Sequence, residues 1–441
     1  MKPWTLALGG GLALALVQQQ LLLSRAPRLL GLSPAAASSG PGALELRFSR
    51  PMDRDSLARS SRITPTAAHQ WLGEGNRPRL LLASGVRVFQ PIDLSVAGAD
   101  RRGMALAPQA WRWDPRPRIV AVASVAGGEQ AQLQDHDGRW RPLSPVWSSI
   151  PALEPLGDGS GVALVSADAR GQHRVWRVDV KQRNLAARAR GLARPVIGAP
   201  RPLGTDPLLF AYLSSNRQGD LVVQGSTEAS GLSSTDLHPR GGGSHRLPLP
   251  SSGPVQLVPQ GGALVVPEVD GLSLMRMGGP VSGRQILPGS RDLSSFCPVG
   301  GRALLVHHRP DFTRALEIVE PGQAPRTLWA GPQALVASAC ERNGSRIWAL
   351  TIEGLGQPRL TLLALDRNGR RLGQRELRGW ELEPGTGLEL DPSRLQLLLT
   401  LRPQQAGGRP SQARPALIDA TSLELRLLNH PVRQARWLVA G

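Results

Sequence analysis

The sequence predicts an all-β fold, a small β-sandwich followed by a β-propeller, with a hydrophobic helix at the N-terminus. Three observations predict it: a recurring β-rich unit, period-two alternation in the segment before it, and a charge-free apolar run at the start. The clearest copy of the unit runs from Cys340 to Gly379, where short apolar runs alternate with turn signals such as Asn343-Gly344. Four short antiparallel strands repeated every 40 to 50 residues or so are typical of propeller blades.

Composition places few limits on the function. The chain has 441 residues and 41% hydrophobic content, enough for two or more packed domains. Its net charge of +18 comes almost wholly from arginine, since Lys2 and Lys181 are the only lysines. GC-biased codon usage explains such a profile, and selection for an acidic partner is the alternative. The arginines are scattered rather than clustered, which disfavours a nucleic-acid partner and leaves an anionic lipid or polysaccharide surface open.

The N-terminal segment, residues 1–24, is predicted to be a signal peptide or a membrane anchor. An apolar run from Trp4 to Leu23 follows Lys2, with no charge before Arg25. Cleavage would make it a signal peptide, whereas an uncut run of residues 4–23 is long enough to anchor the protein in the inner membrane. Both hypotheses predict export, to the periplasm or the cell surface. A buried amphipathic helix is the third interpretation, because three glutamines starting at Gln18 interrupt the apolar run.

The next segments are a predicted linker, sandwich and connector. Residues 25–42 are predicted to be a linker, because their second half is rich in Ala, Ser, Gly and Pro. Residues 43–110 alternate apolar and polar residues between turn signals, which predicts a small β-sandwich. Residues 111–117, bounded by Pro115 and Pro117, are predicted to connect it to the propeller.

Three motifs in residues 43–110 carry a resemblance to a known family. Phe48-Ser-Arg-Pro-Met-Asp53 ends a strand, an Ile63-Thr-Pro65 element follows, and Asp100-Arg-Arg-Gly-Met-Ala-Leu106 closes the segment. This order resembles the bacterial Ig-like domain first described in surface-layer proteins. The resemblance implies an Ig-like spacer that presents another domain, rather than a catalytic unit. Independently of it, Met52 is predicted to lie in the core and Asp53 to cap a turn or short helix.

Residues 118–441 are predicted to form the propeller. The second strands of its blades are predicted to start near Ile119, Val162, Leu208, Ala263, Ala303, Ile347 and Leu395, so seven blades are favoured and six is the alternative. Residues 226–245, within the widest interval, are predicted to be a loop insertion. The last strand, residues 435–440, is predicted to complete the first blade, which has no inner strand of its own. The whole resembles the broad family of propellers with Tol-type or WD-like (WD40-like) blades.

Catalytic motifs are missing from the sequence. It contains no nucleophile elbow, phosphate-binding P-loop or His-Glu-x-x-His zinc motif, so no catalytic, cofactor-binding or metal-ligating residue is assigned. The Asp135-His-Asp-Gly-Arg-Trp140 segment is predicted to be a hairpin turn rather than an acid/base cluster. His307 and His308 are neighbours on a strand, so their side chains point to opposite faces and do not readily chelate one ion.

Cys297 and Cys340 occupy equivalent places in adjacent repeats, each just before the turn into a second strand. They are therefore predicted to face each other near the propeller axis. In an oxidising compartment a disulfide is the natural outcome, and two buried free thiols are the alternative.

The sequence favours a non-enzymatic cell-envelope binding or scaffold protein, in which the spacer presents a propeller that recognises a protein or a polysaccharide. The alternative is a propeller enzyme, a lyase or glycoside hydrolase acting on an envelope polymer. That alternative requires acidic side chains that converge at the channel mouth, with Asp158, Asp206 and Glu268 as the candidates.

Overall fold

A computed structural model describes residues 18, 25–228, 233–249, 251–277, 284–354, 358–404 and 412–440. After residue 25 the described chain is almost entirely β, with one short helix, α2 (Arg54–Ser60). The hydrophobic helix predicted over residues 4–23 lies outside this description apart from Gln18. In the parts of the chain that are described, no helix is both long and apolar enough to cross a membrane.

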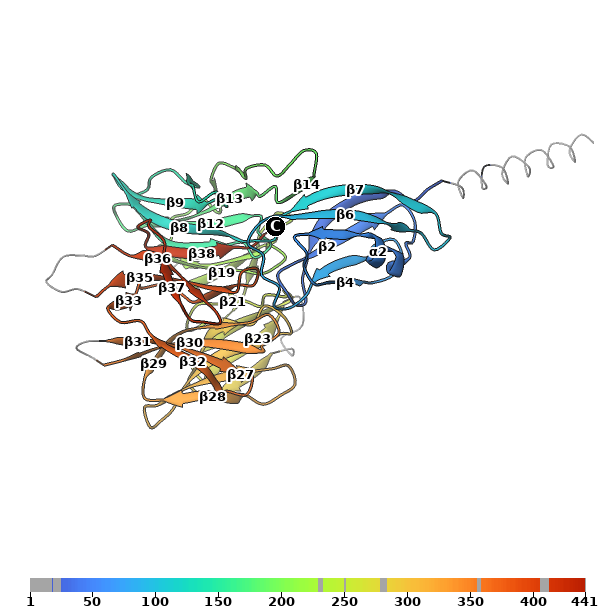
Figure 1. The fold of residues 1–441 in the computed structure, drawn as a ribbon. Helices are drawn as coiled ribbons and strands as arrows, with labels where there is room; N and C mark the ends of the chain where they lie inside the picture. The colour runs from blue at the N-terminus through green and yellow to red at the C-terminus, as the bar shows by residue number, and fades with distance from the viewer. Residues whose placement is uncertain are drawn as a thin grey trace, which may run out of the picture.

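Two four-stranded antiparallel sheets form the N-terminal unit, which we call the sandwich (Figure 1). Their strand orders are β1-β2-β5-β4 and β14-β7-β6-β3. The strands are β1 (Leu29–Ala35), β2 (Ala43–Phe48), β3 (Arg62–Thr64), β4 (His69–Leu72), β5 (Arg79–Leu82), β6 (Ile92–Ala99), β7 (Ala105–Trp113) and β14 (Leu185–Ala187). Alternate residues of both sheets, such as Leu46 and Leu94, share one buried core, as the period-two pattern predicts.

Two residues that precede α2 have the roles predicted from the sequence. Met52 is buried in the sandwich core, and Asp53 caps the helix by accepting a hydrogen bond from the Asp55 backbone N–H at 3.1 Å. Leu57 turns the inner face of α2 into the same core.

Two predicted boundaries need correction. The predicted linker contains β1, which pairs with β2 through contacts such as Leu32 opposite Leu46. Its Gly and Pro residues suit an edge strand, where an outward-facing position needs no backbone N–H donor. The predicted connector begins inside β7, which continues to Trp113 because that indole is buried in the sandwich core.

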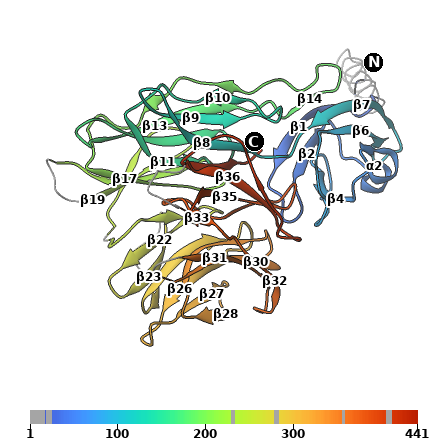
Figure 2. The ribbon, with the colours of Figure 1, turned by 60° about the vertical axis from the view of Figure 1, so that its left-hand side comes forward.

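Seven antiparallel sheets follow, and we call this unit the ring (Figure 2). From the innermost strand outward, the first sheet is β38 (Gln434–Leu438), β8 (Arg118–Val125), β9 (Gly128–Gln134) and β10 (Trp140–Pro142). The second is β11 (Ser149–Pro155), β12 (Gly161–Ala167) and β13 (His173–Lys181), with β15 (Val196–Ile197) and β16 (Arg201–Pro202) paired to β13. The third is β17 (Phe210–Ser215), β18 (Leu221–Ser226), β19 (Ser233–His238) and β20 (His245–Leu247).

The next two are β21 (Gln256–Leu257), β22 (Ala263–Glu268), β23 (Gly271–Arg276), β24 (Gln285–Pro288), and β25 (Arg291–Phe296), β26 (Ala303–His308), β27 (Arg314–Val319), β28 (Arg326–Gly331). The last two are β29 (Ala334–Cys340), β30 (Arg346–Glu353), β31 (Arg359–Asp366), β32 (Arg371–Glu376), and β33 (Trp380–Leu382) with β34 (Glu389–Asp391), β35 (Gln396–Pro403), β36 (Arg414–Asp419), β37 (Leu425–Leu427). Innermost strands of neighbouring sheets contact one another from β38 through β11 and β17 to β21, and from β25 through β29 and β34 back to β38. Between the fourth and fifth sheets, β25 contacts β23.

The ring has no single central core. Instead a separate buried cluster lies between each pair of neighbouring sheets, for example around Leu164 between the first and second sheets. The seventh cluster joins Leu398 and Leu417 of the last sheet to Ala121 and Trp437 of the first. These seven interfaces describe a closed, seven-bladed propeller.

The closing strand is placed as predicted. β38 pairs antiparallel with β8, from Gln434 opposite Val122 to Leu438 opposite Arg118. Trp437 is only 6% exposed. The first and last strands of the ring therefore belong to one sheet, although they lie more than 300 positions apart in sequence.

One strand assignment was wrong. The run at Leu208 leads into β17, an innermost strand, and the second strand of that sheet is β18, which starts at Leu221. The turn between them is built on buried Asn216, whose side-chain oxygen accepts from the backbone N–H of Gln218 and of Asp220, both at 3.0 Å. Residues 226–245 are consequently no loop insertion, because they contain all of β19 and the start of β20. The extra residues that the predicted insertion was meant to explain lie instead between β13 and β17, where residues 182–209 include β14.

The sandwich lies against one end of the ring, at the turns between innermost and second strands (Figure 1). We call this end the covered face and the opposite end the free face. Val88 N–H donates to the Ser393 carbonyl at 2.7 Å, and Arg87 pairs with Asp419 at 2.7 Å. β14, which leaves the second sheet at this end, pairs with β7 and becomes the edge strand of a sandwich sheet.

Candidate functional site

Three charged side chains meet at the ring centre, where the innermost strands converge. Arg436 on β38 pairs with Glu154 on β11 and, through Nε, with Glu389 on β34 at 2.6 Å. The second oxygen of Glu389 accepts the Trp437 backbone N–H at 2.8 Å. The Glu154–Arg436–Glu389 triad therefore ties the closing strand to the sheets on both of its sides.

The triad is paired and only partly enclosed, since the Arg436 side chain is 38% exposed and those of Glu154 and Glu389 are 15% and 26% exposed. Burial raises the pKa of Glu154, and the nearby Glu389 carboxylate adds to this, although the Arg436 guanidinium opposes it. Burial alone would lower the pKa of Arg436, but the two carboxylates raise it well above its ordinary value. The three side chains therefore form one ion-paired cluster around Arg436.

The acidic residues proposed for catalysis do not converge. Asp158 lies in the turn between β11 and β12 on the covered face, where it bonds Ser160 and pairs with Arg240 at 3.1 Å. Glu268 ends β22 at the opposite, free face and pairs with Arg284. Asp206 precedes β17, also on the free face side, and its hydrogen bond comes from its neighbour Thr205. The triad could not be predicted from the sequence, because its members lie on strands whose alternating patterns are ordinary.

A buried polar network joins the sandwich, the first sheet and the second sheet. Arg118, 4% exposed, donates to Asp135 at 3.0 Å and to the side chains of Gln182 and Asn184 at 2.9 and 2.6 Å. Gln182 in turn donates to the Val439 carbonyl at 2.5 Å. The network fixes the start of β8, the segment leading into β14 and the C-terminal strand in one place.

The Asp135–Trp140 segment is the hairpin turn that was predicted, and it also reaches the sandwich boundary. His136 Nδ1 lies 2.8 Å from an Asp114 oxygen, and Arg116 pairs with the same carboxylate at 2.6 Å. Burial would raise the pKa of Asp114, but hydrogen bonds from Arg116 and His136 lower it well below its ordinary range. The cluster is a structural ion-pair network.

The two histidines at the end of β26 bond separate carboxylates. His307 contacts Glu317 at 2.8 Å and His308 contacts Asp292 at 2.7 Å. Among the residues that the structure describes, no group of three or more His, Cys, Asp or Glu side chains is arranged to hold a metal ion.

Cys297 and Cys340 lie side by side at the covered-face ends of β25 and β29. Their sulfurs are bonded in the structure, with a Cα–Cα distance of 5.0 Å that suits a disulfide, and both residues are buried. Whether the bond forms in the protein's own compartment stays a prediction.

The free face carries exposed apolar tips on several sheets. Phe312, in the turn between β26 and β27, is 89% exposed, and Val269, in the turn between β22 and β23, is 93% exposed. Val146 and Leu209, in the segments that lead into β11 and β17, are exposed at the same end. Phe312 also has a φ of 62°, which a side chain other than Gly or Asn rarely adopts. Sequence could flag these residues as apolar turn positions but could not place them on one face.

Comparisons with known proteins find similarity only among solved structures. No family model matches any part of the chain, and no curated protein matches it. The resemblance of residues 43–110 to surface-layer Ig-like domains is thus unsupported by this comparison and stays a prediction.

The structures found are propeller proteins of low identity. TolB from Acinetobacter baumannii is 14% identical, with 72% of this chain and 79% of that chain covered and a TM-score of 0.40. A putative 6-phosphogluconolactonase from Bacteroides fragilis is 14% identical, with 74% and 98% covered and a TM-score of 0.44. The β-propeller domain of the Trilobed protease from Pyrococcus furiosus is 10% identical, with 77% and 95% covered and a TM-score of 0.45. At this level no activity or partner transfers to this chain, and its propeller architecture rests on its own strand pairing.

Proposed function

We propose that this protein is a non-enzymatic binding or scaffold protein of the cell envelope, in which an Ig-like sandwich serves as a spacer and the ring recognises a protein or polysaccharide partner. The observation that carries the proposal is the free face. Val269 and Phe312 are almost fully exposed there, and solvent-exposed apolar side chains gathered on one face are typical of interaction surfaces. The triad supports the same conclusion, because Arg436 engages both carboxylates in ring closure.

The envelope location is proposed from the apolar residues 4–23. β1 starts at Leu29, shortly after them, so an anchor there would place the sandwich next to the membrane and the free face away from it. Truncation should stop at residue 24 to keep β1 intact. We expect the truncated protein to leave the membrane fraction, and its sedimentation with membranes in high salt would contradict an N-terminal anchor.

Cross-linking in envelope extract, followed by identification of the linked species, tests the binding proposal. We expect a Val269→Ser/Phe312→Ser variant to lose the linked species that the unchanged protein captures. The matched control is Leu274→Ser/Ile286→Ser, which removes two exposed apolar side chains from β23 and β24, away from the tips. Equal capture by both variants would overturn the assignment of the free face.

An enzyme acting on an envelope polymer is the second candidate, and one observation favours it. Glu154 and Glu389 do meet at the ring centre, and the raised pKa of Glu154 is what a general acid requires. The test is release of reducing ends or unsaturated sugars from envelope polysaccharides. Activity that Glu154→Gln abolishes without changing stability would support the enzyme and refute the scaffold.

A further inference from the structure

Two arginines of the covered face have no carboxylate partner. Arg217 lies in the turn between β17 and β18, and Arg342 lies in the turn between β29 and β30. Each is bound through Nη1 to one backbone carbonyl at 3.1 Å, Arg217 to Pro298 and Arg342 to Ala37 of the sandwich. Neither forms a salt bridge with any side chain in the described ranges, although most arginines in the ring do.

The charge on these arginines is costly. Burial and, to a smaller extent, the nearby Arg217 charge lower the pKa of Arg342 to about 10, while Asp391 opposes the shift. Burial also lowers the pKa of Arg217. Asp391 is itself engaged, since its two oxygens bond Ser393 and Arg394. Both side chains are half-buried, and charges taken out of water are normally paired, so this pair of like charges lacks a directly bonded anion among the described residues.

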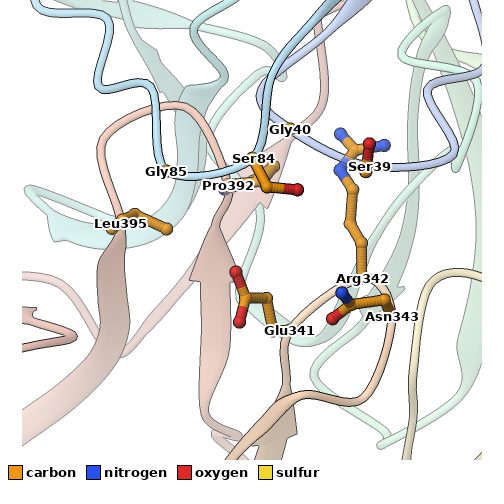
Figure 3. A pocket seen from close by; sticks show the side chains of 9 residues that line it. All are labelled: Ser39, Gly40, Ser84, Gly85, Glu341, Arg342, Asn343, Pro392 and Leu395. Atoms are coloured by element: carbon orange, nitrogen blue, oxygen red, sulfur yellow. The ribbon is translucent and has the colours of Figure 1, made fainter.

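A small cavity lies against Arg342 between the sandwich and the ring (Figure 3). It is lined by Ser39, Gly40, Ser84 and Gly85 from the sandwich and by Glu341, Arg342, Asn343, Pro392 and Leu395 from the ring. Figure 3 shows the Arg342 guanidinium beside Ser39 at one side of the cavity. Arg342 Nε is buried and has no acceptor among the described atoms. The cavity therefore offers an unused charged donor next to serine hydroxyls.

We propose that this cavity binds one monatomic anion of the size of chloride, held by Arg342 between the sandwich and the ring. The volume of about 10 Å³ is at the lower limit for one water molecule, so a tetrahedral oxyanion such as sulfate does not fit, and the larger chloride ion requires the lining side chains to yield slightly. A water molecule would satisfy Nε but would add no negative charge to that of the nearby Asp391 and Glu341 carboxylates. The Glu341 carboxylate, which also lines the cavity and accepts from the Ser345 hydroxyl at 2.6 Å, weakens the site without filling it.

Because the lining comes from both units, bound anion would favour their docked arrangement. The expected signature is a melting temperature that rises with chloride and then saturates. Thermal unfolding of the full chain is measured while chloride replaces gluconate at constant ionic strength. Arg378→Met is the control, since that arginine is highly exposed and paired only with Glu376. We expect saturable stabilisation in the unchanged protein and in the control, and none in Arg342→Met.

A second variant keeps the proposal testable if Arg342→Met does not fold. Glu341→Gln removes one negative charge from the lining, so the chloride concentration at half-saturation should fall several-fold. Crystals grown with bromide should show its anomalous signal beside Arg342 Nε. The proposal is overturned by a chloride response that is linear and equal in all variants, by equal stabilisation with sulfate, or by crystals without that bromide signal.

Discussion

Two strands of this protein pair across long sequence distances, and they differ in what they hold together. β38 supplies five residues to the first sheet, three of them hydrophobic and buried, and its Arg436 contacts both neighbouring sheets. β14 supplies three half-buried residues to the edge of the sandwich. The first attachment closes the ring and is part of its core. The second attaches one finished unit to another, so only the first is expected to be needed for folding.

Removing β38 should therefore have the largest effect. Deletion of residues 434–440 exposes the edge of β8 and removes Trp437, whose lost burial alone costs about 3 kcal/mol or more. It also removes Arg436 and the Val439 carbonyl that accepts from Gln182. Thermal unfolding of the trimmed and full-length proteins measures the effect, with a seven-residue deletion at 405–411 as the length control. Equal melting temperatures for both deletions would show that the ring does not depend on this closure.

A covalent bond between the fifth and sixth sheets gives a reference for the strength of the closing strand. The Cys297–Cys340 bond closes a loop of 43 residues, for which the chain-entropy relation gives about 3 to 4 kcal/mol. Reduction should lower the free energy of unfolding by that order and yet leave the ring folded, because the cluster around Leu304 and Ile347 still joins these sheets. Alkylation of denatured, unreduced protein checks the bond itself, and two reactive thiols there would show that it does not form.

The triad sharpens the comparison further, because it is an electrostatic contribution found at β38 and absent from β14. Arg436→Met leaves Glu154 and Glu389 facing each other, and partial exposure limits the expected loss to about 1 to 3 kcal/mol at pH 7. In this variant burial and the Glu389 carboxylate, no longer opposed by Arg436, raise the folded-state pKa of Glu154 above its unfolded value. A carboxylate whose pKa is raised by folding stabilises the fold below its unfolded pKa, and this stability is lost as the pH rises through its folded pKa. The variant should therefore regain stability when the pH is lowered from 7 to 5.

The control for the triad is Arg402→Met, which breaks one similarly exposed pair with Glu381 on the last sheet. Denaturant unfolding at the two pH values measures both variants. If Arg436→Met loses no more stability than the control, or if its loss is not smaller at pH 5, the triad contributes no more than an ordinary surface ion pair.

The same contrast explains what could be predicted from sequence. The closing strand was predictable because it ends the chain as an alternating apolar strand with no outer strands after it, while Ile119 starts a sheet with no inner strand. Leu208 was misassigned because the true turn at Asn216 is built by side-chain bonds rather than by an Asn-Gly or Gly-Gly signal. The triad could not be predicted, because contacts between Glu154, Glu389 and Arg436 depend on how separate strands meet around the ring. β14 was missed because three residues between arginine-rich segments carry no periodicity.

Breaking the pairing of β14 with β7 should have the smallest effect on folding and the clearest effect on the attachment of the sandwich to the ring. The backbone bonds from Asp114 N–H to Asn184 and from Arg188 N–H to Ala110 place Ala186 at a hydrogen-bonded position opposite Arg112. Ala186→Pro removes that bond, whereas Ala187→Pro removes an N–H that faces away from β7 and serves as the matched control.

We expect Ala186→Pro to cost about 1 to 2 kcal/mol and to speed trypsin cleavage at Arg183, Arg188 and Arg190, with the ring's unfolding transition unchanged. Other contacts, among them those of Arg87 with Asp419, Val88 with Ser393 and Arg342 with Ala37, would still hold the sandwich loosely against the covered face. Loss of the ring transition in Ala186→Pro would place β14 alongside β38 as a folding element. Identical cleavage rates in both variants would show that β14 does not couple the two units.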